Sequence, residues 1–489
     1  MEITNYEQKI FTAHTKVNEI SNYIKENSNE LSAHEAEKYI YHAIMQIGKS
    51  LLECYFSIHN EKEEGKQIED NSGKVYKRHN KENKDYYSIF GKICLLRQTY
   101  WRKGEGSIVP LDIACNMPEK SYSYFLQDVM NILSVTDSFE DSSKKLKRMF
   151  GLEIYNRPLA ETTRASITNY DKYYDDKLPP LEKSEGELQV LSYDGKGVPM
   201  IKKEAAKLKG RQGKGEKRQK KKEALVGVSY TVDKNIRSAE DVATNLVYPV
   251  ADSTCNKSKQ VVPRAKNIRR MASLKKLKID VIQAMQADAL QRNPNNKRQT
   301  VVLIDGMPYL YKLVKKGLNE IKDYVVILDI IHVLEYLYLA AHSIYKENSK
   351  DAKKYVYKQL LGILNGRVGR VIGSMKQTKK KKNLTGNKLK SMEKVITYLS
   401  NHRKLMKYDE YLANGYPIGT GVVESACKLL VKKRMEGCGM RWSLEGAEAM
   451  LTLRSIETSN DWDEYHKFRI EQEAKRLYDP KQFHPKLAA

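Results

Sequence analysis

The chain contains 489 residues, with 86 lysines and arginines against 61 aspartates and glutamates, so its formal net charge is +25 at pH 7. A surplus of this size indicates a polyanionic partner, with nucleic acid ahead of an anionic membrane surface. No apolar run approaches the ~18 residues of a membrane-spanning helix, so we exclude a transmembrane protein and expect no membrane partner. The six scattered cysteines form no Cys-x-x-Cys pair and the N-terminus lacks a signal-peptide pattern, so we expect a reduced, cytoplasmic protein.

The N-terminal region, residues 1–85, is predicted to be mainly helical and to end in a charged loop over 61–85. Residues 33–58 carry apolar side chains at helical spacing, among them Ile40 and Ile44. Such a stripe is typical of a core or a dimer interface rather than of a ligand groove.

Residues 86–175 are predicted to form a DNA-binding region. Its first part, Ser88–Arg102, alternates apolar and polar residues as a half-buried strand does. Helices predicted over Ser138–Phe150 and Leu159–Tyr170 then follow, joined through GLEIYNRP. This is the outline of a helix-turn-helix, although an ordinary helical hairpin explains the pattern equally well. The second helix would carry its recognition side chains near its start, at Thr162, Thr163 and Arg164.

Two short apolar runs, VVLI and YVVIL, each end at an aspartate, Asp305 and Asp329. Both runs are typical of buried parallel strands, and the segment between them has helical spacing and closes at Gly317. The pattern predicts a β-α-β unit with a carboxylate at the end of each strand, which is where open α/β sheets bind their ligands.

Two further carboxylates occupy similar places. A strand predicted over 188–193 ends at Asp194, and a helix that starts near Val422 carries Glu424 in its first turn. Three carboxylates on separate elements suit a two-metal phosphodiester site, because Mg²⁺ prefers oxygen ligands. Spacing alone leaves a second interpretation open, since an Asp-Gly pair is often only a turn and a first-turn glutamate often serves the helix dipole.

A basic insert, residues 202–222, follows the first strand and precedes a second, antiparallel strand predicted at Ala224–Val232. Clusters of this kind neutralise DNA phosphates by counterion release, and we prefer this role to that of a solvated loop. Basic helices are expected within 236–300, around NIRRMASLKKLKIDVIQAM. The predicted DNA contacts of the insert are Lys214, Lys217, Arg218, Lys220 and Lys221.

About 120 residues separate Asp305 from Glu424, far more than the connection between a strand and a helix needs. Residues 338–415 are strongly basic and have helical spacing, so we predict an all-helical insertion.

Further basic residues follow Glu424. Lys428 and Lys432 come four and eight residues later, on the same face of a regular helix, and are candidate phosphate contacts together with Arg434 and Arg441. A solvated basic face is the alternative. Two cysteines of this block, at positions 427 and 438, are expected to be small apolar fillers.

Six segments in order along 190–470 carry a family resemblance. They are SYDGKGVPM (192–200), GKGEKRQKKKEALVGVSYTV (213–232), LIDGMPYLY (303–311), ILDIIHVLEYL (327–337), YPIGTGVVESACKLLVKKRMEGCGMRW (416–442) and NDWDEYHKFR (460–469). In these segments the chain resembles bacterial insertion-sequence DDE transposases of the Mutator-like group, and within that group the Kra-type branch.

The resemblance implies an α/β fold with an RNase H-like catalytic domain, in which Asp194, Asp305 and Glu424 bind two Mg²⁺ ions, with Mn²⁺ able to substitute. Asp329 and His332 match the Asp-x-x-His signature of the group, and His332 would touch the scissile phosphate or support the site, or else be a packed histidine. The helical insertion would line the DNA channel. A small zinc ribbon is common near residue 100 in the family, but the paired cysteines are missing here, so we predict no zinc.

The expected function is DNA cleavage and strand transfer at insertion-sequence ends in a bacterial cytoplasm, in association with the nucleoid. The partners would be terminal inverted repeats, target DNA and further copies of the chain, as a homodimer or higher oligomer. A catalytically inactive or domesticated DNA-binding relative, and another RNase H-like nuclease, are the alternatives. The expected organisation is 1–85 helical, 86–175 DNA-binding, 186–337 and 416–470 catalytic around the 338–415 insertion, and 471–489 as the tail.

Overall fold

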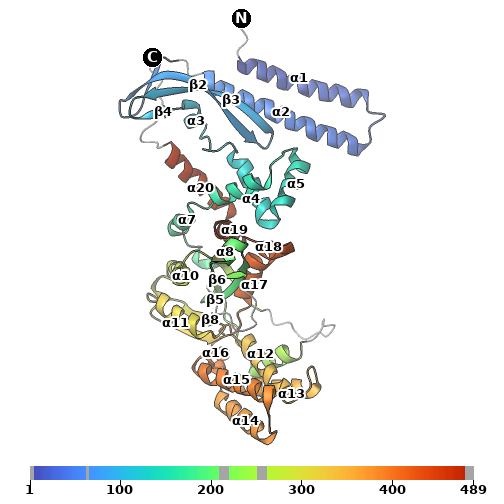
Figure 1. Cartoon of the computed structure of the whole chain (residues 1–489), viewed down its shortest axis with the longest axis vertical. Helices are drawn as coiled ribbons and strands as arrows, with labels where there is room; N and C mark the ends of the chain where they lie inside the picture. Colours follow the sequence, from blue (N-terminus) through green and yellow to red (C-terminus); the bar gives the residue numbers. More distant parts are fainter. Residues whose placement is uncertain (1–4, 62–64, 209–219, 250–261, 479–489) are drawn as a thin grey trace. The chain divides into compact units, whose positions relative to one another are not determined.

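The computed structural model describes residues 5–61, 65–208, 220–249 and 262–478, and these form two compact units. The first unit combines Met1–Tyr173 with Trp462–Ala489, and the second is Tyr174–Asp461. Figure 1 labels many of the helices and strands of both units. Within the described residues no helix combines the length and the apolar character needed to cross a bilayer.

The first unit begins with two long helices that pack on each other, α1 (Asn5–Glu26) and α2 (Ala33–Glu61). A four-stranded antiparallel sheet follows, in the order β1 (Gln67–Glu69), β2 (Val75–Ser88), β3 (Gly91–Arg102) and β4 (Gly106–Ile108).

The prediction of a charged loop over 61–85 is wrong, because most of β2 lies in that range. Its composition, VYKRHNKENKDYYS, is poor in strand formers, but a tight turn at Ser88–Gly91 returns the chain into β3. The buried Ile93 and Leu95 of β3 then fix the pairing, and tertiary context outweighs local propensity.

Short helices complete the first unit around a core of Leu126, Met130, Leu146 and Leu159. They are α3 (Pro110–Ala114), α4 (Tyr124–Thr136), α5 (Phe139–Phe150), α6 (Asn156–Ala165) and α20 (Trp462–Leu477), while α7 (Tyr170–Asp176) leads into the second unit.

The two helices of the predicted helix-turn-helix are present, but two of the three predicted recognition residues are not accessible to DNA. Helix α5 is capped by the Ser138 hydroxyl and ends at Gly151 with φ 68°, and α6 stops at Ala165, short of the predicted end at Tyr170. Thr162 and Thr163 are buried, so they cannot face DNA as expected, whereas Arg164 is exposed.

The second unit is built on a five-stranded sheet in the order β7-β6-β5-β8-β9. Strand β6 pairs antiparallel with both β5 and β7, while β5, β8 and β9 run parallel. The strands are β5 (Leu188–Pro199), β6 (Lys221–Val232), β7 (Lys266–Ser273), β8 (Gln299–Ile304) and β9 (Tyr324–Leu328).

Two predictions are wrong here. Strand β5 does not end at Asp194 but continues to Pro199, because its pairing with β6 persists to Pro199↔Lys221 after its pairing with β8 has stopped. The segment KNIRRMAS is strand β7 rather than a basic helix, since β6 offers it an edge and its last three residues are buried.

Helices of the second unit pack on this sheet or follow it. Helices α10 and α17 pack on β5 and β6, and α19 packs along β7. The elements are α8 (Lys202–Ala205), α9 (Ala239–Val247), α10 (Lys278–Arg292), α11 (Pro308–Gly317), α17 (Gly421–Cys427), a π-helical turn (Lys428–Lys432), α18 (Lys433–Met435) and α19 (Leu444–Thr458).

The chain from β9 to α17 is helical in the range where a helical insertion was predicted. Its elements are α12 (Ile330–His342), α13 (Lys350–Leu364), α14 (Val368–Lys381), α15 (Gly386–His402) and α16 (Tyr408–Ala413). Buried apolar side chains on each, such as Leu337, Leu360, Met375 and Leu399, give them a core of their own.

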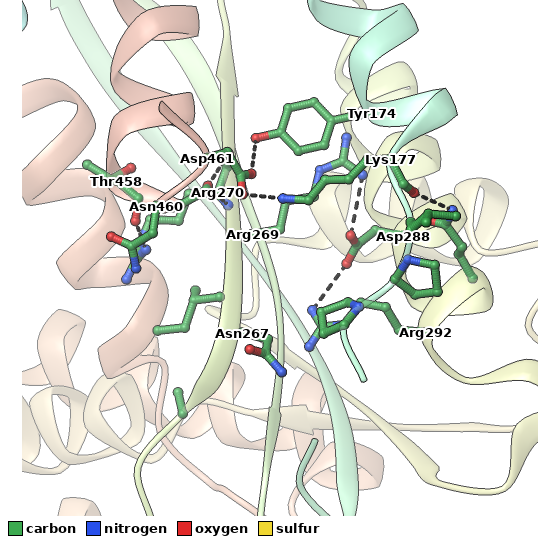
Figure 2. Close-up of a pocket in the computed structure, with 17 residues that line it drawn as sticks. Tyr174, Lys177, Asn267, Arg269, Arg270, Asp288, Arg292, Thr458, Asn460 and Asp461 are labelled. Atoms are coloured by element: carbon green, nitrogen blue, oxygen red, sulfur yellow. Dashed lines mark hydrogen bonds and ion pairs between the residues drawn. The ribbon is translucent and has the colours of Figure 1, made fainter. Parts of the chain in front are cut away.

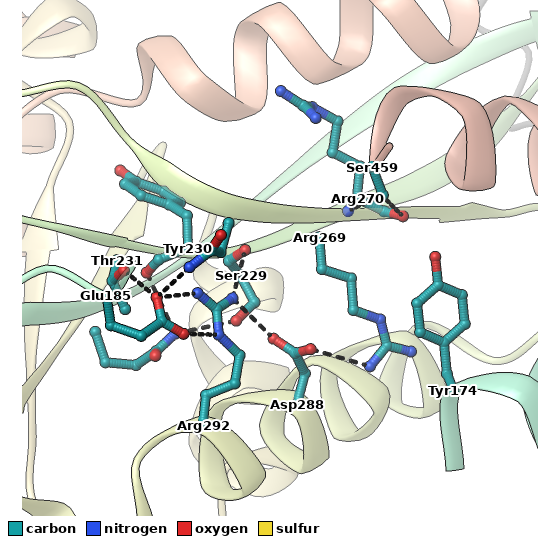
Figure 3. A network of polar contacts seen from close by, with 12 residues as sticks. Tyr174, Glu185, Ser229, Tyr230, Thr231, Arg269, Arg270, Asp288, Arg292 and Ser459 are labelled. Atoms are coloured by element: carbon teal, nitrogen blue, oxygen red, sulfur yellow. Dashed lines mark hydrogen bonds and ion pairs between the residues drawn. The ribbon is translucent and has the colours of Figure 1, made fainter. Parts of the chain in front are cut away.

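A buried ionic network holds the start of the five-stranded sheet to α10 (Figure 3). Arg292 donates to both carboxylate oxygens of Glu185 at 2.8 and 2.9 Å, and it also lies 3.4 Å from Asp288. Asp288 pairs with Arg269 at 3.5 Å, and the Arg269 guanidinium lies 3.9 Å from the centre of the Tyr174 ring. Burial alone would raise the pKa of Glu185, but the hydrogen bonds from Arg292, Thr231 and Asn267 outweigh it, so this pKa lies below its ordinary value.

We predict that Arg292→Met and Glu185→Gln each lower the free energy of unfolding by about 3 kcal/mol, because each leaves a buried partner without its counter-charge. The double variant should lose less than the two single losses added together. Denaturant unfolding measures all three, and Lys407→Met, which breaks an exposed Lys407–Glu410 pair, is the matched control with a loss of at most about 0.5 kcal/mol.

The same network predicts a pH dependence. Because the pKa of Glu185 is lowered in the folded state, its stabilisation is present above the unfolded pKa and is lost as the pH falls through the folded pKa. The difference between wild type and Glu185→Gln should therefore shrink on acidification, and a constant difference would contradict this assignment.

Candidate active site

Three aspartates lie in register at one edge of the five-stranded sheet. The last parallel pairs are Ser192↔Leu303 between β5 and β8 and Ile304↔Leu328 between β8 and β9. Extending the same register places Asp194 opposite Asp305, and Asp305 opposite Asp329. All three therefore stand where the parallel pairing of β5, β8 and β9 stops, at the edge where such sheets usually bind ligands.

Asp194 and Asp305 interact electrostatically. Burial raises the pKa of the Asp305 carboxyl, the negative charge of Asp194 raises it further, and His332 lowers it. The Asp305 side chain accepts a hydrogen bond from Met307 N–H at 2.9 Å, and that of Asp194 accepts one from Gly195 N–H at 2.7 Å. Each bond joins a carboxylate to a backbone N–H one or two residues further along the chain, so both carboxylates stay at the edge of the sheet.

Asp329 has a structural role. Its side chain is fully buried and caps α12 by accepting from Ile331 N–H at 3.1 Å. It also accepts from Thr420 N–H at 3.1 Å and lies 2.8 Å from the Thr420 hydroxyl. A buried carboxylate needs such donors, so Asp329 ties the end of β9 to the loop before α17.

Glu424 is joined to this arrangement through the same threonine. The Thr420 hydroxyl lies 2.9 Å from Glu424 Oε1 as well as 2.8 Å from Asp329 Oδ2. A hydroxyl has one proton to donate, so it can serve only one of the two oxygens at a time. Glu424 itself is exposed in the first turn of α17.

Cys427 links Asp194 to the helix of Glu424. Its Sγ donates to Asp194 Oδ2 at 3.2 Å, and burial, followed by the Asp194 charge, raises the pKa of the thiol. The expectation that Cys427 is merely an apolar filler is wrong. Thr420 and Cys427 stand four residues before and three residues after Glu424, so their spacing could have placed both beside Glu424, but not in contact with Asp329 and Asp194.

Helix α15 of the helical segment supports the loop that carries Asp305. The Tyr398 hydroxyl donates to Asp305 O at 3.3 Å, and His402 Nε2 lies 2.7 Å from Gly306 O. Gly306 has φ +89°, and a Cβ there would stand 2.7 Å from Leu328 and 3.0 Å from the Tyr398 hydroxyl, so glycine is required. Nothing in the sequence motif pointed to Tyr398 or His402.

His332 lies in the first turn of α12 and is partly exposed. Its Nδ1 is 3.3 Å from Glu335 and its Nε2 is 4.0 Å from Asp329. Together with its influence on Asp305, this places the imidazole beside the carboxylate edge.

By their chemistry these carboxylates suit a divalent cation. In the described residues, however, they do not lie close enough together to hold one. The mutual repulsion of Asp194 and Asp305 is what a cation between them would relieve, and carboxylate oxygens are the ligands Mg²⁺ prefers. In the part of the chain that the structure describes, however, no three acidic, histidine or cysteine side chains converge tightly enough to hold an ion.

Of the five DNA contacts predicted in the basic insert, the described residues include two. Lys214, Lys217 and Arg218 lie outside the described residues. Lys220 and Lys221 are exposed where β6 begins, and Lys221 pairs with Glu436 at 2.6 Å.

Two predictions about the basic residues after Glu424 are wrong. Lys428, Lys432 and Arg441 are exposed, but Arg434 is buried, with its guanidinium 5.0 Å from the centre of the Trp442 ring. Arg434 therefore supports the fold and does not present a phosphate contact. The turn from Lys428 to Lys432 is π-helical, so the α-helical spacing used to place Lys432 on the face of Glu424 does not hold.

A separate hollow of about 510 Å³ opens beside β7 and α10 (Figure 2). Most of its charged side chains are already paired: Arg269 and Arg292 with Asp288, and Lys177 with Asp461, which also accepts from Tyr174 at 2.8 Å. Arg270 donates to the Thr458 carbonyl. Asp194, Asp305 and Glu424 are not among its lining residues, so it is distinct from the carboxylate edge.

Comparison with known proteins adds little. No family model matches the chain, and no curated protein matches it. Among solved structures it is similar to the Drosophila P element transposase strand transfer complex, with 9% sequence identity and a TM-score of 0.24 over 73% of this chain and 92% of that chain. A likeness this weak establishes neither the fold nor the activity.

We predict that Thr420→Val lowers the free energy of unfolding by about 1–3 kcal/mol, because the buried Asp329 loses a hydroxyl donor while the side-chain shape is kept. Thr420→Ser retains the hydroxyl and is the control. Denaturant unfolding compares them, and equal stabilities would show that the hydroxyl does not hold Asp329.

Proposed function

We propose that this chain is a DDE transposase of a bacterial insertion sequence, of the Mutator-like group and its Kra-type branch. The observation that carries the proposal is the common register of Asp194 and Asp305 at the sheet edge, with Glu424 brought to the same edge through Thr420 and Cys427. Carboxylates placed together in a chain with net charge +25 are unusual unless they bind a cation.

The fold supports this assignment in part. The strand order β7-β6-β5-β8-β9, with only β6 reversed relative to its neighbours, is compatible with an RNase H-like catalytic domain. The helical segment from α13 to α16 comes between the second aspartate and Glu424, where the resemblance expects an insertion.

In this proposal Asp194, Asp305 and Glu424 hold two Mg²⁺ ions, with Mn²⁺ as a substitute. When bound, such ions activate an oxygen nucleophile and stabilise the charge that develops on the phosphorus. The side chain of Glu424 is exposed. To bind an ion it would give up its hydrogen bond with Thr420 and turn towards the aspartates. Tyr398 and His402 hold the Asp305 loop in place, and His332 approaches the scissile phosphate.

The substrate would be the terminal inverted repeats of the element, followed by target DNA. A water frees the 3′-hydroxyl at the element end, and that hydroxyl then attacks the target phosphodiester, so no covalent enzyme intermediate is needed. The exposed Lys220, Lys221, Lys428, Lys432 and Arg441 would contact DNA phosphates. Such a protein would work in the bacterial cytoplasm, at the nucleoid.

We predict that Asp194→Asn, Asp305→Asn and Glu424→Gln each abolish end cleavage in Mg²⁺ and leave end binding almost unchanged, because each removes a negative ligand without changing side-chain size. Cleavage of DNA from the flanks of the gene and its retardation on gels measure the two activities. Asp351→Asn, an exposed aspartate on α13, is the control and should cut normally.

Full cleavage by any one of the three variants would remove that residue from the site. Binding without cleavage by the wild type would favour an inactive relative. Cutting of branched DNA or RNA/DNA hybrids in preference to ends would favour another nuclease. Short inverted repeats with duplicated target bases beside the gene would support the transposase.

We predict that neutralising Lys214, Lys217, Lys220 and Lys221 to glutamine weakens DNA binding and flattens its salt dependence, because fewer counterions are released. The slope of log affinity against log salt measures this, and its magnitude should fall by up to about 0.9 for each phosphate that the variant no longer neutralises. An unchanged slope would show that the segment is a solvated loop that does not contact DNA phosphates.

A further inference from the structure

Helix α2 has more apolar faces than its own unit covers. One face packs on α1, where Lys16 reaches Ser50 at 3.2 Å and the rings of Tyr23 and Tyr39 stack 4.0 Å apart. A second face packs on the four-stranded sheet through Leu52 and Phe56.

A third face of α2 is apolar and exposed. Ile40, Ile44, Leu51, Tyr55 and Ile58 are each between 37% and 54% exposed. Their spacing of four, seven, four and three residues follows one line along a helix of about 3.6 residues per turn. Ile47 fills the gap on the same line and is half-buried.

Helix α1 extends this face. Because α1 and α2 are antiparallel neighbours, the flank of α1 that carries Ile10 and Val17 adjoins the exposed line on α2. Ile10 is 37% exposed and Val17 is 46% exposed. We name these seven side chains the apolar stripe: Ile10, Val17, Ile40, Ile44, Leu51, Tyr55 and Ile58.

The remaining face of α2 provides the contrast. At the same helical spacing it carries Lys38, His42 and Lys49, which are polar or charged. The exposure of the apolar stripe is therefore not a general property of this helix, since an ordinary surface helix would show polar residues on every uncovered face.

The size of the apolar stripe suits a protein partner. At the exposed fractions above, and with roughly 150–250 Å² for a large side chain, the seven residues offer roughly 450–750 Å² per chain. That matches the largest patches found on monomers, which are often functional. Two such patches together approach the ~1,200 Å² at which specific interfaces begin.

The charge pattern identifies the partner as protein rather than polyanion. The apolar stripe contains no lysine or arginine, although the chain has 86 of them. DNA would find no cation on this face to neutralise its phosphates.

We propose that the apolar stripe is a self-association surface that pairs with the apolar stripe of a second copy of this chain. In a two-fold dimer each apolar stripe contacts the identical stripe of the other chain. The spacing of four and three residues lets the apolar stripe of one α2 pack against that of the other. The pairing opposes the mutual repulsion of two chains of charge +25, so it is driven by apolar burial and strengthens when salt screens that repulsion.

The test is sedimentation velocity of the full chain after nuclease treatment, over a range of protein and salt concentrations. The wild type should form a dimer that survives nuclease and is at least as tight in high salt. Leu51→Glu and Ile44→Glu should each raise the dimer dissociation constant by about 100-fold or more, because a two-fold interface meets each added charge twice.

His42→Glu is the matched control, since it puts the same charge on the opposite face of the same helix, and it should change the dissociation constant by no more than about twofold. Circular dichroism checks that each variant is folded. The milder double variant Ile44→Ala/Leu51→Ala, which should also weaken the dimer, keeps the test valid if a charged variant does not fold.

Three results would overturn the proposal. They are a wild type that stays monomeric at about 100 μM, folded Leu51→Glu and Ile44→Glu variants that dimerise as the wild type does, and an association that nuclease or high salt abolishes. The apolar stripe lies outside the carboxylate edge, so loss of dimerisation and loss of cleavage by Asp194→Asn are separate outcomes.

Discussion

The parallel register of β5, β8 and β9 is the constraint on which the candidate site depends. A shift of one residue in either pairing would turn every side chain of that strand to the other face and would separate Asp194 from Asp305. Buried valines and leucines on these strands prevent such a shift, because it would exchange apolar side chains for polar ones inside the sheet. The core of the sheet thus sets the spacing of the carboxylates.

The buried Asp329 extends that constraint to a distant part of the chain. A carboxylate without solvent must find donors, and two of the three hydrogen bonds that Asp329 accepts come from Thr420, after the whole helical segment. The requirement to satisfy one charge therefore brings the start of α17, and with it Glu424, back to the strand ends. Tyr408, which donates to Leu328 O at 2.7 Å, adds a second tie between the helical segment and β9.

Much of this could be predicted from the sequence, for physical reasons. Short β-branched runs that end in aspartate predicted β8 and β9, and the helix predicted to start near Val422 matches α17, which begins at Gly421. Strands β2 and β7 were missed because their residues are charged and only their neighbours make them strands. Sequence spacing could not show that Arg434 is buried, that Cys427 touches Asp194, or that Thr420 lies between two carboxylates, since each depends on residues far apart in the chain.

The π-helical turn from Lys428 to Lys432 has a consequence for how this region can vary. A π turn holds one residue more than the α-helical turn it replaces, so it adjusts the rotation between Glu424 and the segment that ends at Trp442. That segment is anchored, because Trp442 N–H bonds to Pro199 O at 3.0 Å and Ile201 N–H bonds to Trp442 O at 2.9 Å. The stretch between the two fixed ends therefore tolerates exchange of its exposed side chains but not a change in its number of residues. Homologous chains should keep its length constant even where their amino acids differ.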